Sequence, residues 1–332
     1  MSAAGEMDYT TLGRTGLEVS VAGLGCGGFS RLGLGTGKSE AEAVALIHQA
    51  FDLGVNLFDT AAVYGTEAVL GKALKTLPRD RVVIASKAWI PRGAGLSAGE
   101  HAVASLDNSL RALGVDCIDL FELHGVSPGA YDRARDEIAP ALLREKAKGK
   151  IRHLGVTETG SSDGEHKMAR RAAEDGIWDV MMVAFHMMHQ NARTEIFPRT
   201  LANGVGTLLM FAVRNIFSKP ERLKSELRQL AAAGKVAGWL GAAPNPLGFL
   251  LHPEDGGAAT ITEAAYRYVR HEPGVDVVLF GTGDPEHLRA NIAAILKPPL
   301  PETDRRILAK HFGHLVGVGL DPPVYMPGLV LH

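Results

Sequence analysis

Short apolar runs alternate with amphipathic segments along most of the chain. Eight runs rich in Val, Ile, Leu and Phe predict strands. They begin near Val21, Val55, Val82, Cys117, Ile151, Asp179, Val205 and Val275. The runs are nearly continuous instead of alternating strictly between apolar and polar residues, which is typical of parallel strands buried on both faces. The pattern therefore predicts a parallel sheet whose strands are joined by helices.

Helix starts are marked between these strands. Ser or Thr followed three residues later by Glu forms a capping box, and this spacing occurs at Ser39 and Glu42, Ser97 and Glu100, and Thr260 and Glu263. Asp284 followed by Pro285 is typical of another helix start. Val44, Ile47 and Phe51 share one stripe of the helix predicted before the second strand.

Eight strand–helix units favour a closed (β/α)8 TIM barrel, an α/β fold, over an open doubly wound sheet. A dinucleotide-binding open sheet carries GxGxxG after its first strand, and the glycines that follow Val21 are spaced differently. Residues 8–21 predict an N-terminal β-hairpin that turns at 13–16 and is suited to plug the bottom of the barrel. No linker marks a second domain, so we expect residues 1–332 to form one domain.

The widest gap precedes the last strand and predicts an insertion between strand 7 and strand 8, over residues 218–257. It begins as a helix at 220–233 and continues as a loop rich in Gly and Pro. Long loops at the top of a barrel are often lids. The Gly- and Pro-rich tail, residues 314–332, is expected to lie across the barrel as extended chain.

Charge and composition narrow the possible partners. The chain has 35 basic and 37 acidic residues and a formal net charge of −2, so no basic excess indicates a nucleic acid or an anionic membrane. Cys26 and Cys117 form neither a disulfide framework nor a metal-ligand motif, and a reducing, cytoplasmic setting is the expectation. Residues 1–10 lack the apolar segment of a secretory signal, and no apolar run is long enough to span a bilayer.

Asp59, Lys87 and His124 stand at three strand ends, where (β/α)8 barrels place their chemistry, and Tyr64 follows Asp59 in the loop above. Reduction of a carbonyl by hydride needs a proton donor, and a free tyrosine with a pKa of about 10 is a poor donor at neutral pH. A neighbouring lysine lowers that pKa, a carboxylate orients the lysine, and a histidine orients the carbonyl oxygen. Each residue alone also has an ordinary structural interpretation; their coincidence favours chemistry.

Six stretches resemble the aldo-keto reductase family, in family order and over nearly the whole chain: TLGRTGLEVSVAGLGCGG, GVNLFDTAAVYGTEAVLGKAL, VVIASKAW, DLFELH, GKIRHLGVTE and GTGDPEHLRANI. The resemblance implies a catalytic tetrad at Asp59, Tyr64, Lys87 and His124. It implies that Tyr64 is the general acid in reduction and the base in oxidation. It also implies a nicotinamide cofactor that binds in extended form across the barrel mouth.

The resemblance extends to cofactor contacts, with several departures. The implied positions are Gly25, Cys26, Gly27, Asp59, Thr157, Glu158, Met182, Phe211, Ala212, Val213, Arg214, Gly281, Thr282, Gly283, His287, Arg289 and Asn291. Thr157 would contact the carboxamide and Phe211 would stack on the nicotinamide. Glu158 and Met182 replace the usual Asn and Gln, and Met cannot make the hydrogen bond of an amide. Phe211 and Met182 suit ordinary core packing equally.

NADP(H) is favoured over NAD(H) as the cofactor. The start of the last helix would hold the 2′-phosphate on its backbone amides, with Arg289 as the cation. Three residues argue in the other direction. Gly281 replaces a frequent Lys, His287 replaces a frequent Arg, and the charge of Asp284 would repel a phosphate.

The candidates for a mostly apolar substrate pocket are Phe29, Trp89, Val126 and Phe185, together with the tail around Tyr325 and Met326. Glu122 lies two residues before His124 and should share its face of the strand. A carboxylate inside the barrel is costly unless it is paired. Glu122 therefore either tunes His124, bridges to Lys87 or reaches solvent at the rim, and the rim is the favoured expectation.

The leading hypothesis is NAD(P)(H)-dependent reduction of an aldehyde or ketone to an alcohol. An alternative is oxidation of a sugar hemiacetal, because residues 137–160 and the departures at Glu158 and Met182 resemble the aldose-dehydrogenase branch of the family. A non-catalytic, cofactor-binding partner of other proteins is a hypothesis of a different class, which the complete tetrad disfavours. A Schiff-base lyase needs a neutral Lys87, which Asp59 opposes. The oligomeric state is left open.

Overall fold

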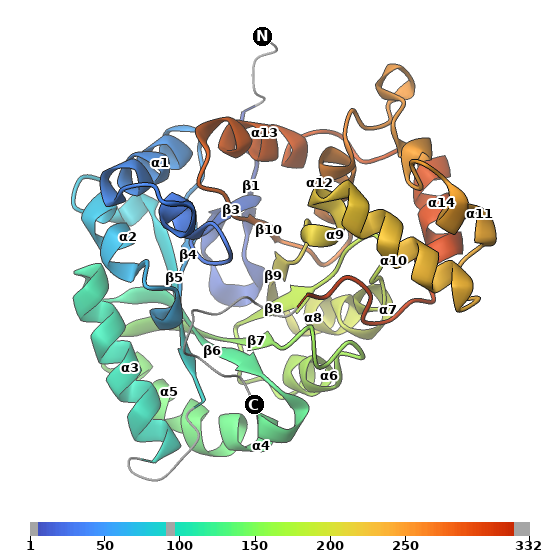
Figure 1. Ribbon diagram of the computed structural model, residues 1–332. Helices are drawn as coiled ribbons and strands as arrows, with labels where there is room; N and C mark the ends of the chain where they lie inside the picture. Colours follow the sequence, from blue (N-terminus) through green and yellow to red (C-terminus); the bar gives the residue numbers. More distant parts are fainter. Residues whose placement is uncertain (1–5, 91–96, 322–332) are drawn as a thin grey trace.

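The computed structural model describes residues 6–90 and 97–321. Eight parallel strands close into a barrel in chain order, with the last strand pairing with the first (Figure 1). The strands are β3 (Ala22–Gly25), β4 (Leu57–Asp59), β5 (Val83–Trp89), β6 (Ile118–Val126), β7 (Ile151–Glu158), β8 (Val180–Ala184), β9 (Gly206–Met210) and β10 (Val277–Phe280). Each begins at its expected position or within two residues of it. The predicted (β/α)8 barrel is confirmed.

The N-terminal hairpin plugs one end of this barrel. Strand β1 (Tyr9–Thr11) pairs antiparallel with β2 (Glu18–Ser20) across the predicted turn. Leu12 and Val19 join the apolar cluster formed by the inward-facing residues of the barrel strands. The contact is close at Gly206, because a Cβ there would lie 2.8 Å from the side chain of Leu12. The hairpin therefore buries apolar surface against the strand starts, at the end opposite to the expected site.

Helices surround the barrel. They are α1 (Glu40–Asp52), α2 (Glu67–Leu74), α3 (Ala98–Leu113), α4 (Tyr131–Arg133), α5 (Ala139–Ala147), α6 (Lys167–Glu174), α7 (Ala192–Glu195), α8 (Phe197–Asn203), α9 (Asn215–Ser218), α10 (Pro220–Ala232), α11 (Gly238–Ala242), α12 (Ile261–Arg270), α13 (Pro285–Ile295) and α14 (Glu302–Phe312). Within the described ranges, no helix is long and apolar enough to cross a membrane.

The predicted helix starts are confirmed in most details. Both Ser39 and Ser97 form complete capping boxes, and Asp284 caps α13. At α12 only half of the box forms. Thr260 accepts a hydrogen bond from the amide of Glu263, whose carboxylate pairs instead with Arg267 and Lys297. On α1 the expected Ile47 is buried, but the expected Val44 and Phe51 are only half-buried. The other buried residues of this helix are Ala43, Leu46 and Ala50.

The insertion packs beside the barrel as part of its core. Helix α10 buries Leu223, Leu227 and Leu230 in the main apolar cluster. The stretch expected to be a loop contains the short helix α11, whose Trp239 contacts His311 of α14 edge to face. Figure 1 shows α10, α11 and α14 gathered at one side of the barrel. The insertion is therefore more regular than its glycines and prolines indicated.

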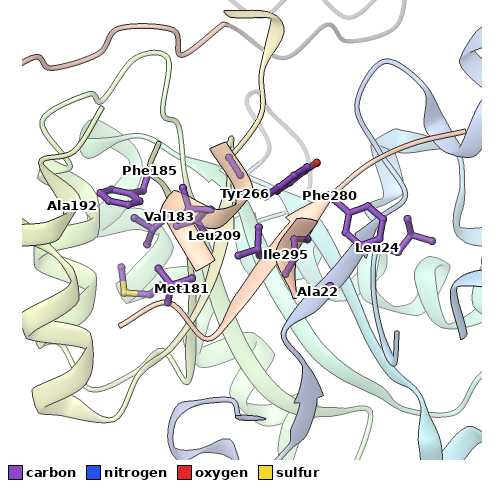
Figure 2. Packing of buried hydrophobic residues seen from close by; sticks show 14 of the residues in the cluster. Ala22, Leu24, Met181, Val183, Phe185, Ala192, Leu209, Tyr266, Phe280 and Ile295 are labelled. Atoms are coloured by element: carbon purple, nitrogen blue, oxygen red, sulfur yellow. The ribbon is translucent and has the colours of Figure 1, made fainter. Parts of the chain in front are cut away.

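The main core lies between the strands and the surrounding helices. Figure 2 shows outward-facing residues of the strands, such as Leu24, Val183 and Phe280, beside residues of the helices, such as Tyr266 and Ile295. A second cluster, which includes Leu57, Leu120 and Met182, fills the barrel interior. Alternation along each strand thus sends one set of side chains to the helices and the other into the barrel.

Candidate active site

Asp59, Lys87 and His124 lie on three consecutive strands of the barrel. Strand β4 pairs with β5, and β5 pairs with β6, so the three side chains come from adjacent strands of the barrel. Alternation along β5 puts Lys87 on the same face as Val83 and Ala85, which belong to the interior cluster. The side chains therefore meet in the barrel mouth although they are far apart in the sequence.

Tyr64 comes from the turn after β4 and completes the group. It ends a short 3-10 helix (Ala62–Tyr64), and Gly65 follows in the left-handed conformation. The phenolic oxygen of Tyr64 lies 3.3 Å from Nε2 of His124, and the two rings meet edge to face. The ring of Tyr64 also lies against Gly27, where a Cβ would come within 2.5 Å of it. A glycine at position 27 is therefore required by the place that Tyr64 takes.

Lys87 is a buried cation held by several acceptors. Its Nζ pairs with Oδ1 of Asp59 and donates to the carbonyl oxygen of Thr60 at 2.9 Å. The same Nζ lies 5.5 Å from the centroid of the Tyr64 ring. Burial alone would lower the pKa of Lys87, but Asp59, Tyr64 and Glu122 outweigh burial and raise that pKa above its ordinary value. Lys87 is therefore charged and fixed beside Tyr64.

His124 is neutral at pH 7. Burial, followed by the positive charge of Lys87, holds the pKa of His124 well below its usual range. Trp89 stacks on the imidazole, with ring centroids 4.5 Å apart and planes inclined by 28°. A neutral imidazole presents one N–H donor and one acceptor, so His124 is able to donate to an oxygen placed near Tyr64.

Glu122 does not reach the rim as expected. The residue is completely buried inside the barrel, and its Oε2 lies 3.8 Å from Nζ of Lys87. The favoured expectation of a solvent-exposed carboxylate is wrong, because the strand continues past Glu122 to Val126 before it reaches the mouth. Of the alternatives, the structure supports proximity to Lys87.

Sequence reasoning missed the residues that support the tetrad. Glu67 accepts a hydrogen bond from the hydroxyl of Ser86 at 2.6 Å, and both side chains are buried. The hydroxyls of Thr60 and Thr66 bond to each other at 2.9 Å. These contacts fasten the turn of Tyr64 to β4 and β5. Glu67 lies within one of the family-like stretches, and this was the available signal.

The ends of β3 and β10 form a glycine-lined part of the mouth. A Cβ at Gly281 would meet backbone oxygen of Gly25 at 3.4 Å and that of Gly27 at 4.0 Å. Gly25 in turn meets only the backbone of Phe280. Cys26 is fully buried, its amide donates to the carbonyl oxygen of Asp59, and burial raises the pKa of its thiol. Among the described residues, only backbone atoms lie within 4 Å of a Cβ at Gly25 or Gly281.

The residues of β7 and β8 that were expected to contact the carboxamide already interact with other groups of the protein. The hydroxyl of Thr157 accepts from the amide of Gly125 at 2.6 Å. Glu158 accepts from the amide of Ala184 at 2.6 Å and pairs with Nδ1 of His166 at 2.7 Å. Met182 belongs to the apolar cluster of the barrel interior. Glu158 therefore faces His166, away from that interior.

Phe211 and the three residues after it form the loop that follows β9. Phe211 has a left-handed backbone with φ of 72°, which is uncommon for a bulky residue. Its ring fits against Gly160, where a Cβ would lie 2.8 Å from it. The guanidinium of Arg214 lies 4.3 Å from the ring centroid and donates to the carbonyl oxygen of Asp321. Ala212 is buried and Val213 is half-buried.

The side chain of Asp284 caps the N-terminus of α13. Oδ1 of Asp284 accepts hydrogen bonds from the amides of Glu286 and His287, at 2.8 Å and 3.1 Å. The hydroxyl of Thr282 accepts from the amide of Asp284. Gly283 packs so closely on Gly33 that a Cβ would lie 2.3 Å from its Cα. Two further expected contacts lie on α13 itself: Arg289 is exposed and Asn291 is half-buried.

Of the expected pocket residues within 6–90 and 97–321, the structure brings only Trp89 to the tetrad. Phe29 is exposed over 73% of its surface. Val126 and Phe185 are fully buried in the main core, and Phe185 stacks on Tyr268. A break in the strand pairing between Leu123 and Val126 explains why Val126 leaves the face of His124.

Neither the C-terminal tail nor the two surface hollows of the structure identify the substrate pocket. The tail candidates, Tyr325 and Met326, lie outside the described residues. Two surface hollows of about 440 Å³ and 480 Å³ lie along α3 and share Asp107. Neither is lined by a residue of the tetrad.

The chain is similar to known proteins over most of its length. The sequence model of the Aldo/keto reductase family matches residues 23–311. The chain is 29% identical to L-galactose dehydrogenase of Arabidopsis thaliana over 301 residues, which cover 87% of this chain and 88% of that protein. The holo form of an aldo-keto reductase from Bacillus halodurans shares the fold, with a TM-score of 0.68 at 23% identity over 95% of this chain and all of that one. Because the family match spans most of the barrel, the chain belongs to the Aldo/keto reductase family, a family of oxidoreductases.

Proposed function

We propose that this protein is an NAD(P)(H)-dependent oxidoreductase that reduces an aldehyde or ketone to an alcohol, with Tyr64 as the general acid. The observation that carries the proposal is the meeting of three groups in one mouth. The hydroxyl of Tyr64 is within 3.3 Å of His124, and the charged Lys87 lies 5.5 Å from the tyrosine ring. A small carbonyl compound or sugar is the expected substrate.

The four side chains have separate tasks in this reaction. His124 is neutral, and we assign its proton to Nε2, from which it would donate to the carbonyl oxygen of the substrate and orient it. Tyr64 gives its proton to the same oxygen as the alcohol forms. Lys87 stabilises the phenolate that remains on Tyr64, and Asp59 holds Lys87 in place and balances its charge. In the reverse direction the phenolate of Tyr64 accepts the proton of the alcohol.

The residues around the mouth fit a nicotinamide cofactor. A Cβ at Gly25 or Gly281 would meet only backbone atoms of the described residues, and Phe211 offers an aromatic ring beside the guanidinium of Arg214. When bound, the nicotinamide supplies the hydride for reduction or accepts it in oxidation. Thr157 already accepts a hydrogen bond from the amide of Gly125, so it would have to share its hydroxyl with a carboxamide. Glu158 faces His166 instead.

The preference for NADP(H) over NAD(H) stays a prediction, as do the individual cofactor contacts. Arg289 is the exposed cation on α13 that a 2′-phosphate would use. Asp284 opposes this, because its carboxylate already accepts the amide hydrogen bonds that the helix start would offer to an anion. The balance between Arg289 and Asp284 therefore decides the preference.

A second candidate function is aldose dehydrogenation with NAD(P)+. The similarity to L-galactose dehydrogenase favours it, and the same tetrad serves because Tyr64 then acts as the base. A Schiff-base mechanism is disfavoured, since it needs a neutral Lys87 and the buried ion pair with Asp59 keeps this group charged. A non-catalytic cofactor-binding role is opposed by the complete tetrad.

The domain organisation and the setting also remain proposals. Residues of the barrel, the insertion and α14 share one apolar cluster, which supports a single domain over residues 1–332. Cys26 and Cys117 are free thiols, which is compatible with the cytoplasmic setting that the sequence predicts.

One assay tests the proposal and separates its two forms. Aldehydes and ketones are tested with NADPH and NADH, and aldoses with NAD+ and NADP+, by following the absorbance of the reduced nicotinamide. We expect turnover in at least one arm, which Tyr64→Phe abolishes. Turnover of aldoses alone would move the assignment to the dehydrogenase. Absence of turnover in every arm, with cofactor still bound, would support the non-catalytic role instead.

A further inference from the structure

Glu122 is an enclosed carboxyl group that the mechanism above leaves unused. Alternation along β6 puts Leu120, Glu122 and His124 on one face, and Leu120 belongs to the apolar cluster of the barrel interior. Glu122 has no exposed surface. Burial of a carboxyl group costs free energy unless nearby groups compensate, so its neighbours must account for its presence.

Glu122 has a glycine on one neighbouring strand and a charged residue on the other. In the strand register Glu122 stands opposite Lys87 of β5 and opposite Gly155 of β7. A Cβ at position 155 would lie 2.8 Å from Cγ of Glu122. Glycine inside a strand usually weakens a sheet and marks a close approach. Gly155 is thus the residue that lets Glu122 lie beneath the tetrad.

The charged group that pairs with Glu122 is the ammonium of Lys87. Oε2 of Glu122 lies 3.8 Å from Nζ, and among the described residues neither oxygen of Glu122 has a hydrogen-bond partner. Lys87 donates to Asp59 and to the carbonyl oxygen of Thr60. An ammonium has three N–H donors. Among the described residues one donor therefore remains, and Glu122 and the ring of Tyr64 are both near it.

We propose that Glu122 is a positioning residue that acts through Lys87, as a second carboxyl partner that sets how strongly the ammonium stabilises the phenolate of Tyr64. The inference rests on the proposed function of Tyr64. While Glu122 is protonated, Asp59 alone opposes the positive charge of Lys87. Once Glu122 ionises, a second negative charge offsets the ammonium and makes the phenolate less favourable.

The charge balance around Glu122 places this switch near neutral pH. Burial is the largest influence on the pKa of Glu122 and raises it, Lys87 lowers it and Asp59 raises it, and the resulting pKa is about 8. The titratable groups that face it are Asp59 from β4, Lys87 from β5, His124 from β6 and Tyr64 above. Gly155 of β7 and Met182 of β8 add none. Glu122 is therefore neutral at pH 7 and ionises as the pH rises through about 8, which pushes proton loss from Tyr64 to higher pH.

The pH dependence of oxidation by the full-length protein tests this inference. Glu122→Gln and Glu122→Leu both remove the ionisation, and Leu also suits the apolar interior. In both variants we expect the rising limb of the rate, which reports the phenolate of Tyr64, to move to lower pH by roughly one unit. Glu145→Gln is the matched control: Glu145 is also buried, but it lies on α5 and pairs with Lys148 and Lys150. We expect its profile to follow that of the wild type.

Two results would overturn the inference. One is an unchanged profile in both variants at position 122. The other is a shift with Leu but not with Gln, which would mean that packing matters and charge does not. If Tyr64→Phe is inactive while the Glu122 variants keep the wild-type profile, the proposed function stands and only this inference fails. If Tyr64→Phe keeps its turnover, the proposed function fails first.

A second measurement does not depend on turnover. Infrared difference spectra of the wild type and Glu122→Gln should contain the carbonyl band of a protonated carboxylic acid at neutral pH. The band should disappear as the pH rises through about 8. A wild-type spectrum without this band at neutral pH would show an ionised Glu122 and would refute the proposed switch.

Discussion

The phenolic oxygen of Tyr64 lies 3.3 Å from Nε2 of His124, across sixty residues of sequence. The contact joins the turn after β4 to β6 and brings the Tyr64 hydroxyl and the His124 imidazole to the same part of the mouth. Tyr64→Phe keeps the ring against Gly27 and removes only the hydroxyl. We expect turnover to fall roughly hundredfold to ten-thousandfold, the usual contribution of a general acid. Cofactor affinity, measured by fluorescence titration, should stay at the wild-type value. Loss of both together would indicate that the mouth has rearranged.

Gly27 should be as sensitive as the tetrad itself. In Gly27→Ala the new methyl group would lie 2.5 Å from the ring of Tyr64 and must displace it. We expect kcat to fall by up to about a hundredfold, because small misplacements of reacting groups are costly, while the melting temperature changes little. Gly129→Ala is the control, since a Cβ at that exposed position meets nothing within 4 Å. Equal kcat values in the two variants would contradict the prediction.

The buried ion pair predicts a large loss of stability when one partner is removed. Asp59→Asn leaves the charge of Lys87 without its main counter-ion, and breaking such a pair costs about 3 kcal/mol or more. The double variant Asp59→Asn with Lys87→Met should recover much of this loss, because no uncompensated charge remains. Urea unfolding measures the free energies. Equal destabilisation in the single and double variants would show that charge is not the cause.

Asp284 should control the choice between the two cofactor forms. Asp284→Ser keeps a helix cap and removes the negative charge from the start of α13. We expect NADPH to bind roughly fivefold more tightly to this variant and NADH to bind as before, in line with the usual strength of a charge at a helix end. Arg289→Gln is the complementary variant and should weaken NADPH binding alone. An equal gain for both cofactors in Asp284→Ser would separate Asp284 from the 2′-phosphate.

Two buried histidines predict a loss of stability in mild acid. Burial and nearby positive charge lower the pKa of His186 to about 3, and burial and neighbouring histidines lower that of His189 to about 2. Both are neutral in the folded state, whereas an unfolded histidine takes up a proton below about pH 6.5. Stability should therefore be complete above pH 6.5 and fall as the pH decreases, by roughly 2 kcal/mol for each histidine down to about pH 5.

Variants at these two positions check this prediction. His189 accepts from the amide of Gly317 and His186 from that of Met188, both through Nδ1, and an asparagine oxygen is able to take that place. His186→Asn and His189→Asn should flatten the dependence of unfolding free energy on pH. His166 acts in the opposite sense, because Glu158 outweighs burial and raises the pKa of His166. An undiminished slope in both variants would contradict the assignment.

The sequence predicted what depends on local pattern. The strands, the hairpin and the order of Asp59, Tyr64, Lys87 and His124 all follow from apolar runs and their ends. Prediction from the sequence failed where the surroundings of a side chain depend on a residue of another strand. The depth of Glu122 depends on Gly155 across the sheet, and nothing near Glu122 in the sequence indicates it.

Two further side-chain surroundings could not be predicted for the same reason. Val126 should have pointed into the mouth by alternation, but the pairing of β6 with β7 breaks near Gly125, whose φ is 61°. The hydrogen bonds of Glu158 to His166 and to the amide of Ala184 were not predicted either, and its expected cofactor contact stays a prediction. Bulges and long-range ion pairs leave no periodic signal in the sequence.

The N-terminal hairpin has a consequence for proton traffic. Leu12 and Val19 close the far end of the barrel with apolar side chains, so we expect Asp59, Lys87 and Glu122 to exchange protons with bulk water through the mouth. A ligand seated there would isolate these groups for the length of a catalytic cycle. We then expect Glu122 to keep, through one turnover, the protonation state that it held when the ligand arrived.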